Sequence, residues 1–367
     1  MKKVKVGIVG CGNISGIYMQ NLSTMFANTE VFACADTVRE RAEAAAEKYE
    51  IPHVWTTEEL LASPEIEIVV NLTTPIGHYE ICKSALLHDK HVYVEKPLSL
   101  SLEHGEELTR LAREKGLMLG CAPDTFLGAG LQTCRKLIDD GFIGDPVAAT
   151  AFMLNHGHEG WHPDPEFYYQ EGGGPMFDMG PYYLTALVSL LGPVKTVCGM
   201  AKKSFPQRTI TSAPKFGQTI DVEVPTHVAG TLEFISGPVA TMITSFDVWD
   251  STLPRIEIYG SRGTLIVPDP NTFGGPILFK PAGGEGFAEI PVLHSHAMNS
   301  RGIGVADMAA CMTSGNTHRA NGELANHVLE IMHAFHTSSE SKRYAELVTS
   351  CERPRPLAPG LIQGIVD

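Results

Sequence analysis

The stretch of sequence that decides the fold is VKVGIVGCGNISG, residues 4–16. An apolar, β-branched run leads into a glycine-rich turn, and a helical pattern follows. Gly10 permits a tight turn from strand to helix, and Gly12 lets a pyrophosphate approach the N–H groups at the positive end of the helix. Ser15 replaces the third glycine of the GxGxxG motif. The alternative interpretation is therefore an ordinary tight turn that binds no dinucleotide. The contacts expected for a bound dinucleotide are Gly10, Gly12, Asn13 and Ile14.

The same alternation continues along the first third of the chain. Helical patterns such as residues 37–50 separate four further apolar runs: EVFACAD (30–36), IEIVVNL (66–72), HVYVEK (91–96) and GLMLGCA (116–122). Strands that are apolar on both faces and alternate with helices are typical of a parallel sheet covered by helices. The sequence therefore predicts a doubly wound α/β domain at residues 1–122.

The pattern changes in residues 123–367. Turn residues bound five runs that are expected to form strands of a largely antiparallel sheet: 147–156, 227–237, 239–249, 255–267 and 276–283. Helical patterns accompany them at 128–141, 181–192 and 321–342. A second, α+β domain is therefore predicted, with a proline-rich tail (352–360) that is expected to pack back on the first domain.

Length and composition narrow the class of protein. The 367 residues exceed the ~250 to 300 residues at which a single core stops growing, which also favours two domains. With 43% hydrophobic and 19% charged residues and no biased tract, the chain is neither collagen, coiled coil nor disordered. The net charge of -14 repels phosphate backbones and anionic lipids, so neither nucleic acid nor membrane is an expected partner.

Cysteine usage and hydropathy indicate the compartment. The eight cysteines are scattered without a CxxC pair, as in proteins of a reducing compartment. The first residues lack the ~7 to 15-residue apolar run of a signal peptide, and no stretch approaches the ~18 apolar residues of a membrane helix. A cytoplasmic location is expected.

Asp36 ends the second predicted strand, close to the ~20-residue spacing at which an acidic side chain reaches the ribose hydroxyls of an adenosine. Its carboxylate would repel a 2′-phosphate, so NAD is the expected cofactor and NADP is less favoured. The nearby cation of Arg39 favours NADP instead, because it could bind that phosphate. A helix N-cap is the structural alternative for Asp36. Further contacts with the cofactor are expected after the third strand, from Thr73, Thr74, Pro75 and His78. For His78, capping or solvation is an equal alternative.

Two segments carry a family resemblance. HVYVEKPLS places Glu95, Lys96 and Pro97 after the fourth strand and resembles the Glu-Lys-Pro motif of the Gfo/Idh/MocA oxidoreductases. EGGGPMFDMGPYYL (171–184) resembles that family's glycine run followed by Asp-x-Gly-x-His. The resemblance implies a Rossmann domain that binds the cofactor also through Glu95, Lys96 and Pro97. It further implies a substrate domain with a large open sheet, and a homo-oligomer, dimer or tetramer.

The resemblance also implies three catalytic and substrate-binding residues: Lys96, Asp178 and Tyr182. A lysine at the carboxyl end of a strand can donate a hydrogen bond to the oxygen at a reacting carbon. Asp178 and Tyr182 are at i and i+4, on one face of a helix. Tyr182 replaces the usual histidine, and its ordinary pKa of ~10 means that the Lys96 cation is needed to favour the phenolate. Structural alternatives are a packing role for Tyr182 and a helix N-terminal carboxylate for Asp178.

The segment NHGHEGWHPDPEFYYQ (155–170) places His156, His158, Glu159, Trp161 and His162 close together. These residues are expected to line a sugar pocket, with Trp161 stacking on the ring and the histidines bonding to its hydroxyls. A surface loop and a zinc site are the alternatives; the resemblance implies no metal. His294 and His296 could reach the same pocket. Asp124 is a further expected substrate contact. It lies in Pro-Asp-Thr-Phe (123–126), where relatives often have a basic run, so a strongly anionic substrate is disfavoured.

The leading functional hypothesis is an NAD-dependent oxidoreductase that transfers a hydride between nicotinamide and a hydroxyl carbon of a sugar, cyclitol or glycoside. Redox-neutral, NAD-dependent glycoside cleavage by the same fold is the first alternative. A non-catalytic NAD-binding sensor is the second.

Overall fold

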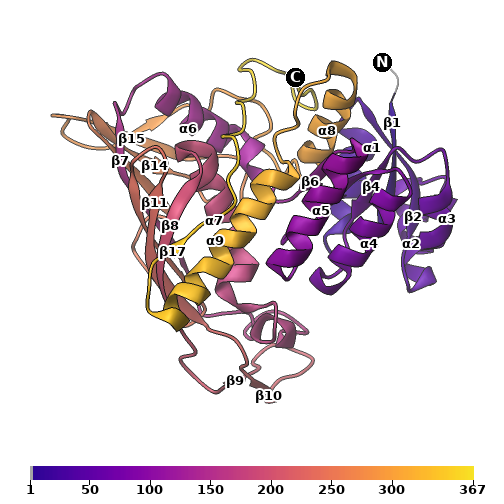
Figure 1. The fold of residues 1–367 in the computed structure, drawn as a ribbon, viewed down its shortest axis with the longest axis horizontal. Coiled ribbons are helices and arrows are strands. Elements are labelled where there is room, and N and C mark those ends of the chain that lie inside the picture. Colours follow the sequence, from indigo (N-terminus) through magenta and orange to yellow (C-terminus); the bar gives the residue numbers. More distant parts are fainter. Residues whose placement is uncertain (1–2) are drawn as a thin grey trace.

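The computed structural model describes residues 3–367, and its N-terminal part is a six-stranded parallel sheet (Figure 1). Its strands are β1 (Val4–Val9), β2 (Thr29–Ala35), β3 (His53–Val54), β4 (Ile68–Asn71), β5 (His91–Val94) and β6 (Leu119–Cys121). All five pairings are parallel, in the order β3-β2-β1-β4-β5-β6. The strand order reverses between β1 and β4, and in such sheets ligands bind at the carboxyl ends beside this point.

Helices cover both faces of this sheet (Figure 1). They are α1 (Ser15–Thr24), α2 (Arg39–Tyr49), α3 (Thr57–Ala62), α4 (Pro75–Leu87) and α5 (Leu102–Lys115). All four residues of β4 are buried, which explains why its first three residues, 68–70, are all apolar. The predicted Rossmann architecture is confirmed; the two-residue strand β3 is too short to give a sequence pattern.

A nine-stranded sheet forms the C-terminal part, in the order β16-β15-β14-β13-β7-β12-β11-β8-β17. Its strands are β7 (Pro146–Leu154), β8 (Val194–Lys202), β11 (His227–Phe234), β12 (Val239–Ser245), β13 (Ile256–Gly260), β14 (Gly263–Val267), β15 (Ile277–Pro281), β16 (Ala288–Ile290) and β17 (Ala345–Glu346). The β7–β12 pair is parallel and the other pairs are antiparallel. The expected large, mostly antiparallel sheet is thereby confirmed. A small hairpin, β9 (Gln207–Thr209) and β10 (Thr219–Asp221), stands apart from it.

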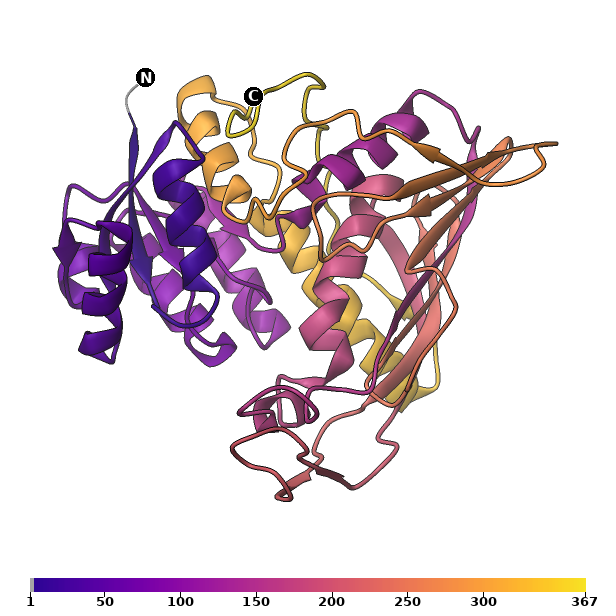
Figure 2. The same ribbon diagram turned by 180° about the vertical axis from the view of Figure 1, so that it is seen from behind.

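Two long helices join the sheets. α7 (Gly174–Leu191) and α9 (Gly322–Ser341) pack on one face of the large sheet, and α9 also packs against α5 of the first domain (Figure 2). The remaining helices are α6 (Ala129–Asp139), α8 (Ile303–Ser314) and the 3-10 turns η1 (Thr125–Leu127) and η2 (Glu166–Tyr169). One buried apolar cluster runs from the first sheet through α7 to the large sheet, so the two sheets hold the space between them in a fixed geometry.

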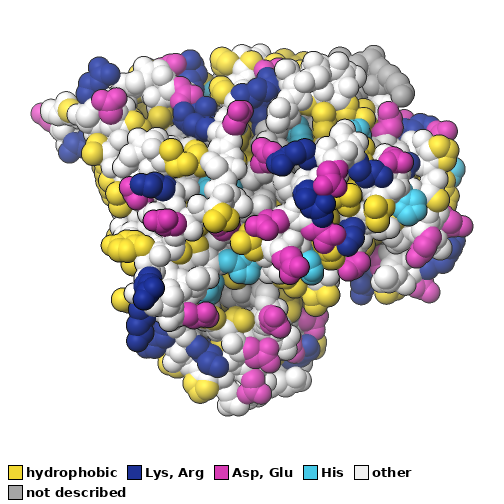
Figure 3. All heavy atoms as spheres, in the orientation of Figure 1, with side chains coloured by type: hydrophobic (Ala, Val, Ile, Leu, Met, Phe, Trp, Pro, Cys, Tyr) yellow, Lys and Arg dark blue, Asp and Glu magenta, His cyan; other side chains and the backbone are white. Residues whose placement is uncertain are grey.

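One face of the surface shows how charged side chains are distributed. Figure 3 shows acidic and basic side chains interspersed over one face, and the outline is indented between the lower lobe and the N-terminal domain. The tail returns to the first domain: the Gln363 amide donates to Met25 Sδ at the end of α1 (3.3 Å), and the Gly364 N–H donates to His296 Nε2 (3.0 Å).

Candidate active site

A cavity of about 300 Å³ lies between the carboxyl ends of the parallel strands and the start of α7. Segments after β1, β4 and β5 form one wall, while η2, the glycine run and α7 form the other. The lining residues are Ile14, Thr73, Pro75, Glu95, Lys96, Pro97, Phe167, Tyr168, Gly172, Gly173, Phe177, Asp178 and Tyr182. All three residues expected to be catalytic therefore face one space.

The glycine turn fits the diphosphate of NAD. Gly10 has φ +98°, and a Cβ there would stand 2.7 Å from the Leu72 backbone, so only glycine fits between the ends of β1 and β4. At Gly12 a Cβ would meet nothing within 4 Å, so this face of the turn is open to a ligand. The first turn of α1 has neither a side-chain cap nor an acidic residue. The N–H groups of Gly12, Asn13 and Ile14, in the turn that leads into α1, would hold the phosphates.

Asp36 holds the glycine turn, and the helix N-cap considered for it is not formed, because Val38 is the N-cap residue of α2. Its Oδ2 accepts the N–H of Cys11 in the glycine turn (2.7 Å) and its Oδ1 accepts the N–H of Val38 before α2 (2.8 Å). The half-buried carboxylate thus shapes the turn and stays accessible to a ribose. Arg39 extends along its own helix, with Nε 2.8 Å from Glu43 Oε1.

The segment after β4 corrects one expectation. Thr73 Oγ1 donates to Asn71 Oδ1 (2.7 Å), Thr74 precedes α4 and Pro75 begins it. The predicted cofactor contact of His78 is wrong, because its ring is fully buried. Its Nδ1 is 2.6 Å from the Pro97 carbonyl oxygen and its Nε2 is 3.1 Å from that of Thr73. His78 couples two cavity-lining segments instead of touching a ligand.

Glu95 fixes the backbone that presents Lys96. Its Oε2 accepts the Lys96 N–H (2.9 Å), and its Oε1 accepts the hydroxyl of Tyr18 (2.8 Å), a fully buried residue of α1. The glycine turn and the Glu-Lys-Pro segment are therefore linked through the same helix. Tyr18 gave no sequence signal beyond its place on the buried face of α1.

Lys96 and Asp178 form an ion pair across the cavity. Lys96 Nζ donates to Oδ1 (2.8 Å) and to the carbonyl oxygen (2.7 Å) of Asp178. Pro181 lies inside α7, and a proline opens the helical turn before it, which is where this carbonyl lies. Burial alone would lower the pKa of Lys96, but Asp178 more than reverses this and raises it. Burial alone would likewise raise the pKa of Asp178, but Lys96 and His158 hold it well below its usual range. Both groups are charged at neutral pH.

Tyr182 lies one turn after Asp178 on the same helix and is 8% exposed. The Lys96 ammonium is 5.5 Å from the centre of its ring. Burial raises the pKa of the Tyr182 hydroxyl, while the positive charges of Lys96 and Arg301 act in the opposite direction. Arg301, from the loop before α8, was not expected from the sequence.

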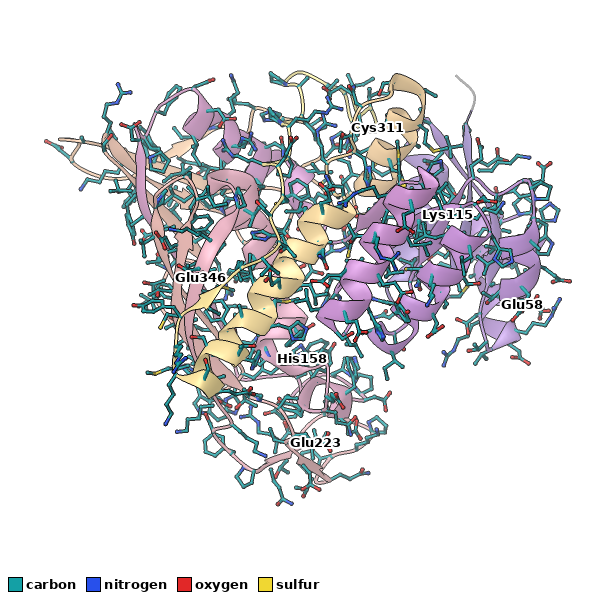
Figure 4. The ribbon with its side chains drawn as sticks, viewed as in Figure 1. Glu58, Lys115, His158, Glu223, Cys311 and Glu346 are labelled. Carbon is teal, nitrogen blue, oxygen red and sulfur yellow. The ribbon has the colours of Figure 1, made fainter. Side chains whose placement is uncertain are left out.

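His158 holds the second oxygen of the Asp178 carboxylate. Its Nε2 is 3.3 Å from Asp178 Oδ2, and its ring stacks on Tyr168 with centroids 3.6 Å apart. Figure 4 places His158 above the lobe formed by the β9–β10 hairpin, toward α9. At 7% exposure, His158 orients Asp178 in place of the direct substrate contact that we expected.

The other residues expected from segment 155–170 lie around the contact between His158 and Asp178. Trp161 is 64% exposed and its ring centre is 5.2 Å from that of His158. His156 stacks on Trp249 at 3.4 Å, and His162 Nδ1 accepts the N–H of Asp164 (3.0 Å). None of these three lines the cavity in the structure.

Three cavity-lining aromatic residues were missed: Phe167, Tyr168 and Phe177. Gly173 lets the η2 turn pack against α7, since a Cβ there would stand 2.5 Å from the Phe167 carbonyl oxygen. The sequence signal that could have found two of them is the Phe-Tyr-Tyr run at 167–169 before the glycines.

Asp124, an expected substrate contact, lies elsewhere, and so do His294 and His296, which could have reached the same pocket. Asp124 is 1% exposed, and its Oδ2 accepts the N–H groups of Gly302 (2.8 Å) and Gly304 (3.1 Å) at the start of α8. Burial raises the pKa of this carboxyl to about 6. His294 Nδ1 is 3.2 Å from Thr133 Oγ1, and His296 accepts the Gly364 N–H. All three are buried polar groups that hold loops together.

Within residues 3–367, no three His, Cys, Asp or Glu side chains are grouped as ligands for a metal ion, so the zinc alternative has no ligand set there. Over the same residues, every helix is too short or too polar to cross a membrane.

Comparisons with known proteins agree with this geometry. Residues 4–122 match the model of an oxidoreductase family with an NAD-binding Rossmann fold, and residues 131–266 match the GFO/IDH/MocA C-terminal domain. The chain is 34% identical over 271 residues to dTDP-3,4-didehydro-2,6-dideoxy-alpha-D-glucose 3-reductase of Saccharopolyspora spinosa, covering 72% of this chain and 75% of that protein. It is 27% identical over 276 residues to D-glucoside 3-dehydrogenase of Escherichia coli, covering 72% and 77%.

Solved structures share the fold over nearly the whole chain. Levoglucosan dehydrogenase in complex with NADH and levoglucosan superposes with a TM-score of 0.81 at 18% identity, covering 95% of this chain and all of the other. An NAD binding oxidoreductase from Klebsiella pneumoniae gives 0.83 at 20% identity, with coverage of 95% and 100%. From the motifs, the architecture and these matches together, the chain belongs to the Gfo/Idh/MocA family of oxidoreductases.

Proposed function

We propose that the chain is an NAD-dependent dehydrogenase that oxidises a hydroxyl carbon of a sugar, cyclitol or glycoside. The observation that carries the proposal is the meeting of Lys96, Asp178 and Tyr182 in one cavity beside the glycine turn. The names of relatives support this substrate class, since they include D-glucoside 3-dehydrogenase and scyllo-inositol 2-dehydrogenase (NAD(+)).

Each side chain has a part in the chemistry. NAD, held by the glycine turn and Asp36, would supply the acceptor for the hydride of the carbinol carbon. Lys96 donates a hydrogen bond to the substrate oxygen and stabilises its developing negative charge. Tyr182 takes the hydroxyl proton. Asp178 and His158 keep the Lys96 ammonium in place, and aromatic side chains on the α7 wall limit the access of water.

Charge supports a neutral polyol over a sugar phosphate. Lys96 is the single Lys or Arg among the residues that line the cavity in the described chain, and Asp178 already pairs with it. A phosphate group would find no free cation there, whereas hydroxyls can bond to the ion pair. Trp161, exposed beside His158, would offer a flat apolar surface for a sugar ring.

The test is the formation of NADH with a panel of free sugars, inositols and glycosides. NADH formation with at least one of them is expected. Binding of NAD without NADH formation from any of them would reject the simple dehydrogenase. Release of an aglycone without net NADH would favour redox-neutral cleavage, and NAD binding with no turnover at all would favour a sensor.

Asp36→Asn tests the cofactor preference. We expect the preference for NAD over NADP, measured as the ratio of the two dissociation constants, to fall by about tenfold or more, since a like-charge contact costs several kcal/mol. The amide keeps an oxygen that can accept the Cys11 N–H, so the turn is preserved. Asp250→Asn, an exposed carboxylate in the loop after β12, is the matched control. An unchanged ratio would show that Asp36 does not face the ribose.

The same proposal includes a homo-oligomer, dimer or tetramer, and a cytoplasmic location. Light scattering on the purified chain measures the oligomeric state directly.

A further inference from the structure

The two ring nitrogens of His158 have different surroundings. Its Nε2 is 3.3 Å from Asp178 Oδ2, whereas its Nδ1 is buried and no side chain or backbone group within residues 3–367 bonds to it. A histidine that serves a carboxylate or a metal is usually oriented by a hydrogen bond at its other ring nitrogen. No protein group supplies that bond here. The orientation of the ring therefore depends on aromatic packing and on the backbone that carries it.

Aromatic packing restrains the ring only in part. His158 stacks on Tyr168 with centroids 3.6 Å apart, and its ring centre is 4.8 Å from that of Phe246. A stacked ring can still slide across its neighbour, because offset arrangements are favourable over a range of positions. The position of Nε2 within the stack is thus left to the backbone of residues 156–159.

Arg208, from the β9–β10 hairpin, bonds to the chain on both sides of His158. Its Nη2 donates to the His156 carbonyl oxygen (2.8 Å), and its Nε donates to Glu159 Oε1 (2.9 Å). Arg208 is 6% exposed and Glu159 is 5% exposed, so their ion pair is shielded from water. Breaking such a buried pair is costly, and the loop of His158 is therefore held firmly at two points.

The same guanidinium is anchored to the large sheet. Its Nη1 donates to Asp247 Oδ1 (2.9 Å) and its Nη2 also donates to the Phe246 carbonyl oxygen (2.9 Å), directly after β12. Asp247 Oδ2 in turn accepts the hydroxyl of Thr226 (2.6 Å), the residue before β11. Arg208 therefore connects the loop of His158 to the ends of two sheet strands.

Tyr169 of η2 links the same groups from the other side. Its hydroxyl accepts the His158 N–H (3.3 Å) and donates to Glu159 Oε2. Gly157 shows how closely these groups approach: its φ is +83°, and a Cβ there would stand 2.6 Å from Glu159 Oε2 and closer still to the Tyr169 hydroxyl oxygen. Only glycine fits at this position. We call the contacts of Arg208, Glu159 and Tyr169 with residues 156–159 the Arg208 clamp.

We propose that Arg208 is a positioning residue that acts through His158 on Asp178, and this inference rests on the proposed function of the site. Arg208 lies outside the cavity lining, so it acts at a distance from the substrate. The clamp keeps His158 Nε2 at Asp178 Oδ2, which leaves Oδ1 to Lys96. Without it the carboxylate would turn and draw the Lys96 ammonium away from the substrate oxygen. A displacement of about 1 Å at a reacting group can lower the rate by about 10²-fold.

Tyr169→Phe is the mildest change to the clamp, because it removes the hydroxyl and keeps the ring. With the substrate found in the panel, kcat is expected to fall about tenfold, while KM for NAD is expected to change by less than about twofold, because the glycine turn is on the other wall of the cavity. Arg208→Lys keeps the charge but loses the fork that bonds to four acceptors, so kcat is expected to fall at least as far. Tyr259→Phe is the matched control, since that hydroxyl also donates to a glutamate, Glu257 (2.7 Å), but lies outside the cavity lining.

A double-mutant cycle with His158 separates positioning from a general loss of structure. His158→Phe keeps the stack on Tyr168 but has no nitrogen to offer Asp178. In this background, Tyr169→Phe and Arg208→Lys are expected to lower kcat no further. A purely structural clamp would lower kcat by the same factor in both backgrounds.

A second readout does not depend on turnover. In protein labelled with 15N-histidine, the NMR signal of Nε2 responds to a carboxylate at that nitrogen, and the His158 signal is identified by its loss in His158→Phe. We expect Tyr169→Phe and Arg208→Lys to move this signal toward that of a histidine free in water. Tyr259→Phe is expected to leave it in place.

The inference is overturned if the two clamp variants leave both kcat and the His158 signal unchanged. It is also overturned if they lower kcat equally in the wild-type and His158→Phe backgrounds, since the clamp would then act on the structure as a whole. Should the wild-type chain turn over none of the panel, the proposed function fails, yet the His158 signal still decides whether Arg208 positions this ring.

Discussion

Lys96→Met is expected to lower kcat/KM by about 10³-fold or more, because it removes both the donor to the reacting oxygen and the charge that stabilises the alkoxide. NAD affinity is expected to change little, since the glycine turn and Asp36 are proposed to supply most of the contacts with the dinucleotide. Steady-state kinetics with the substrate found in the panel measure kcat/KM. Fluorescence measures the dissociation constant of NAD.

Lys96→Arg sharpens this prediction. The guanidinium can keep the ion pair with Asp178, so the fold is preserved, but a planar fork on a different stem cannot place one donor at the Lys96 Nζ position. We expect it to be nearly as inactive as the Met variant. Lys83→Met is the control, because Lys83 pairs with Glu107 outside the cavity. Full activity of Lys96→Met would remove this residue from the mechanism.

Arg319→Met is expected to lower the free energy of unfolding by about 3 to 5 kcal/mol, which is typical for breaking one partner of a buried ion pair. Arg319 and Asp307 of α8 are both fully buried and form a direct ion pair. The same guanidinium donates to the carbonyl oxygens of Arg355 (3.1 Å) and Pro356 (3.1 Å), so it also holds the C-terminal tail. Urea unfolding followed by fluorescence measures the loss.

Two further variants test the cause. The double variant Asp307→Leu/Arg319→Met removes both charges and is expected to recover part of the stability, because no unpaired charge stays buried. Arg343→Met, at an exposed position after α9, is expected to change the free energy of unfolding by less than about 0.5 kcal/mol. A loss below about 1 kcal/mol in Arg319→Met would show that the pair does not hold this region together.

Much of the fold could be predicted because its signals are local. The alternation of buried strands and helices in the first third gives the parallel sheet, since a β4 sequence such as IVVN is apolar on both faces. β8 escaped prediction because Lys195 and Gly199 interrupt its apolar pattern. Only packing explains this glycine, since a Cβ at Gly199 would stand 2.6 Å from the Phe335 carbonyl oxygen of α9.

The site was predicted less completely, and the misses share one cause. His78 and Asp124 were expected at ligands, yet each is a buried polar group bonded to the backbone of another segment. A titratable side chain in a pattern does not show whether its partner is a ligand or the backbone of a distant segment. Arg301 and Tyr18 were missed for the converse reason, because no motif surrounds them.

The sequence by itself determined the two architectures, the glycine turn with Asp36, and the Glu-Lys-Pro and Asp-x-Gly-x-Tyr segments, because periodicity and motif order are properties of neighbouring residues. The tertiary structure alone decided that Lys96 pairs with Asp178, 82 residues away, and that His158 holds the other carboxylate oxygen. Charged groups leave water only when partners replace their hydration. Which partners meet is fixed by the shared apolar core that brings the two sheets together.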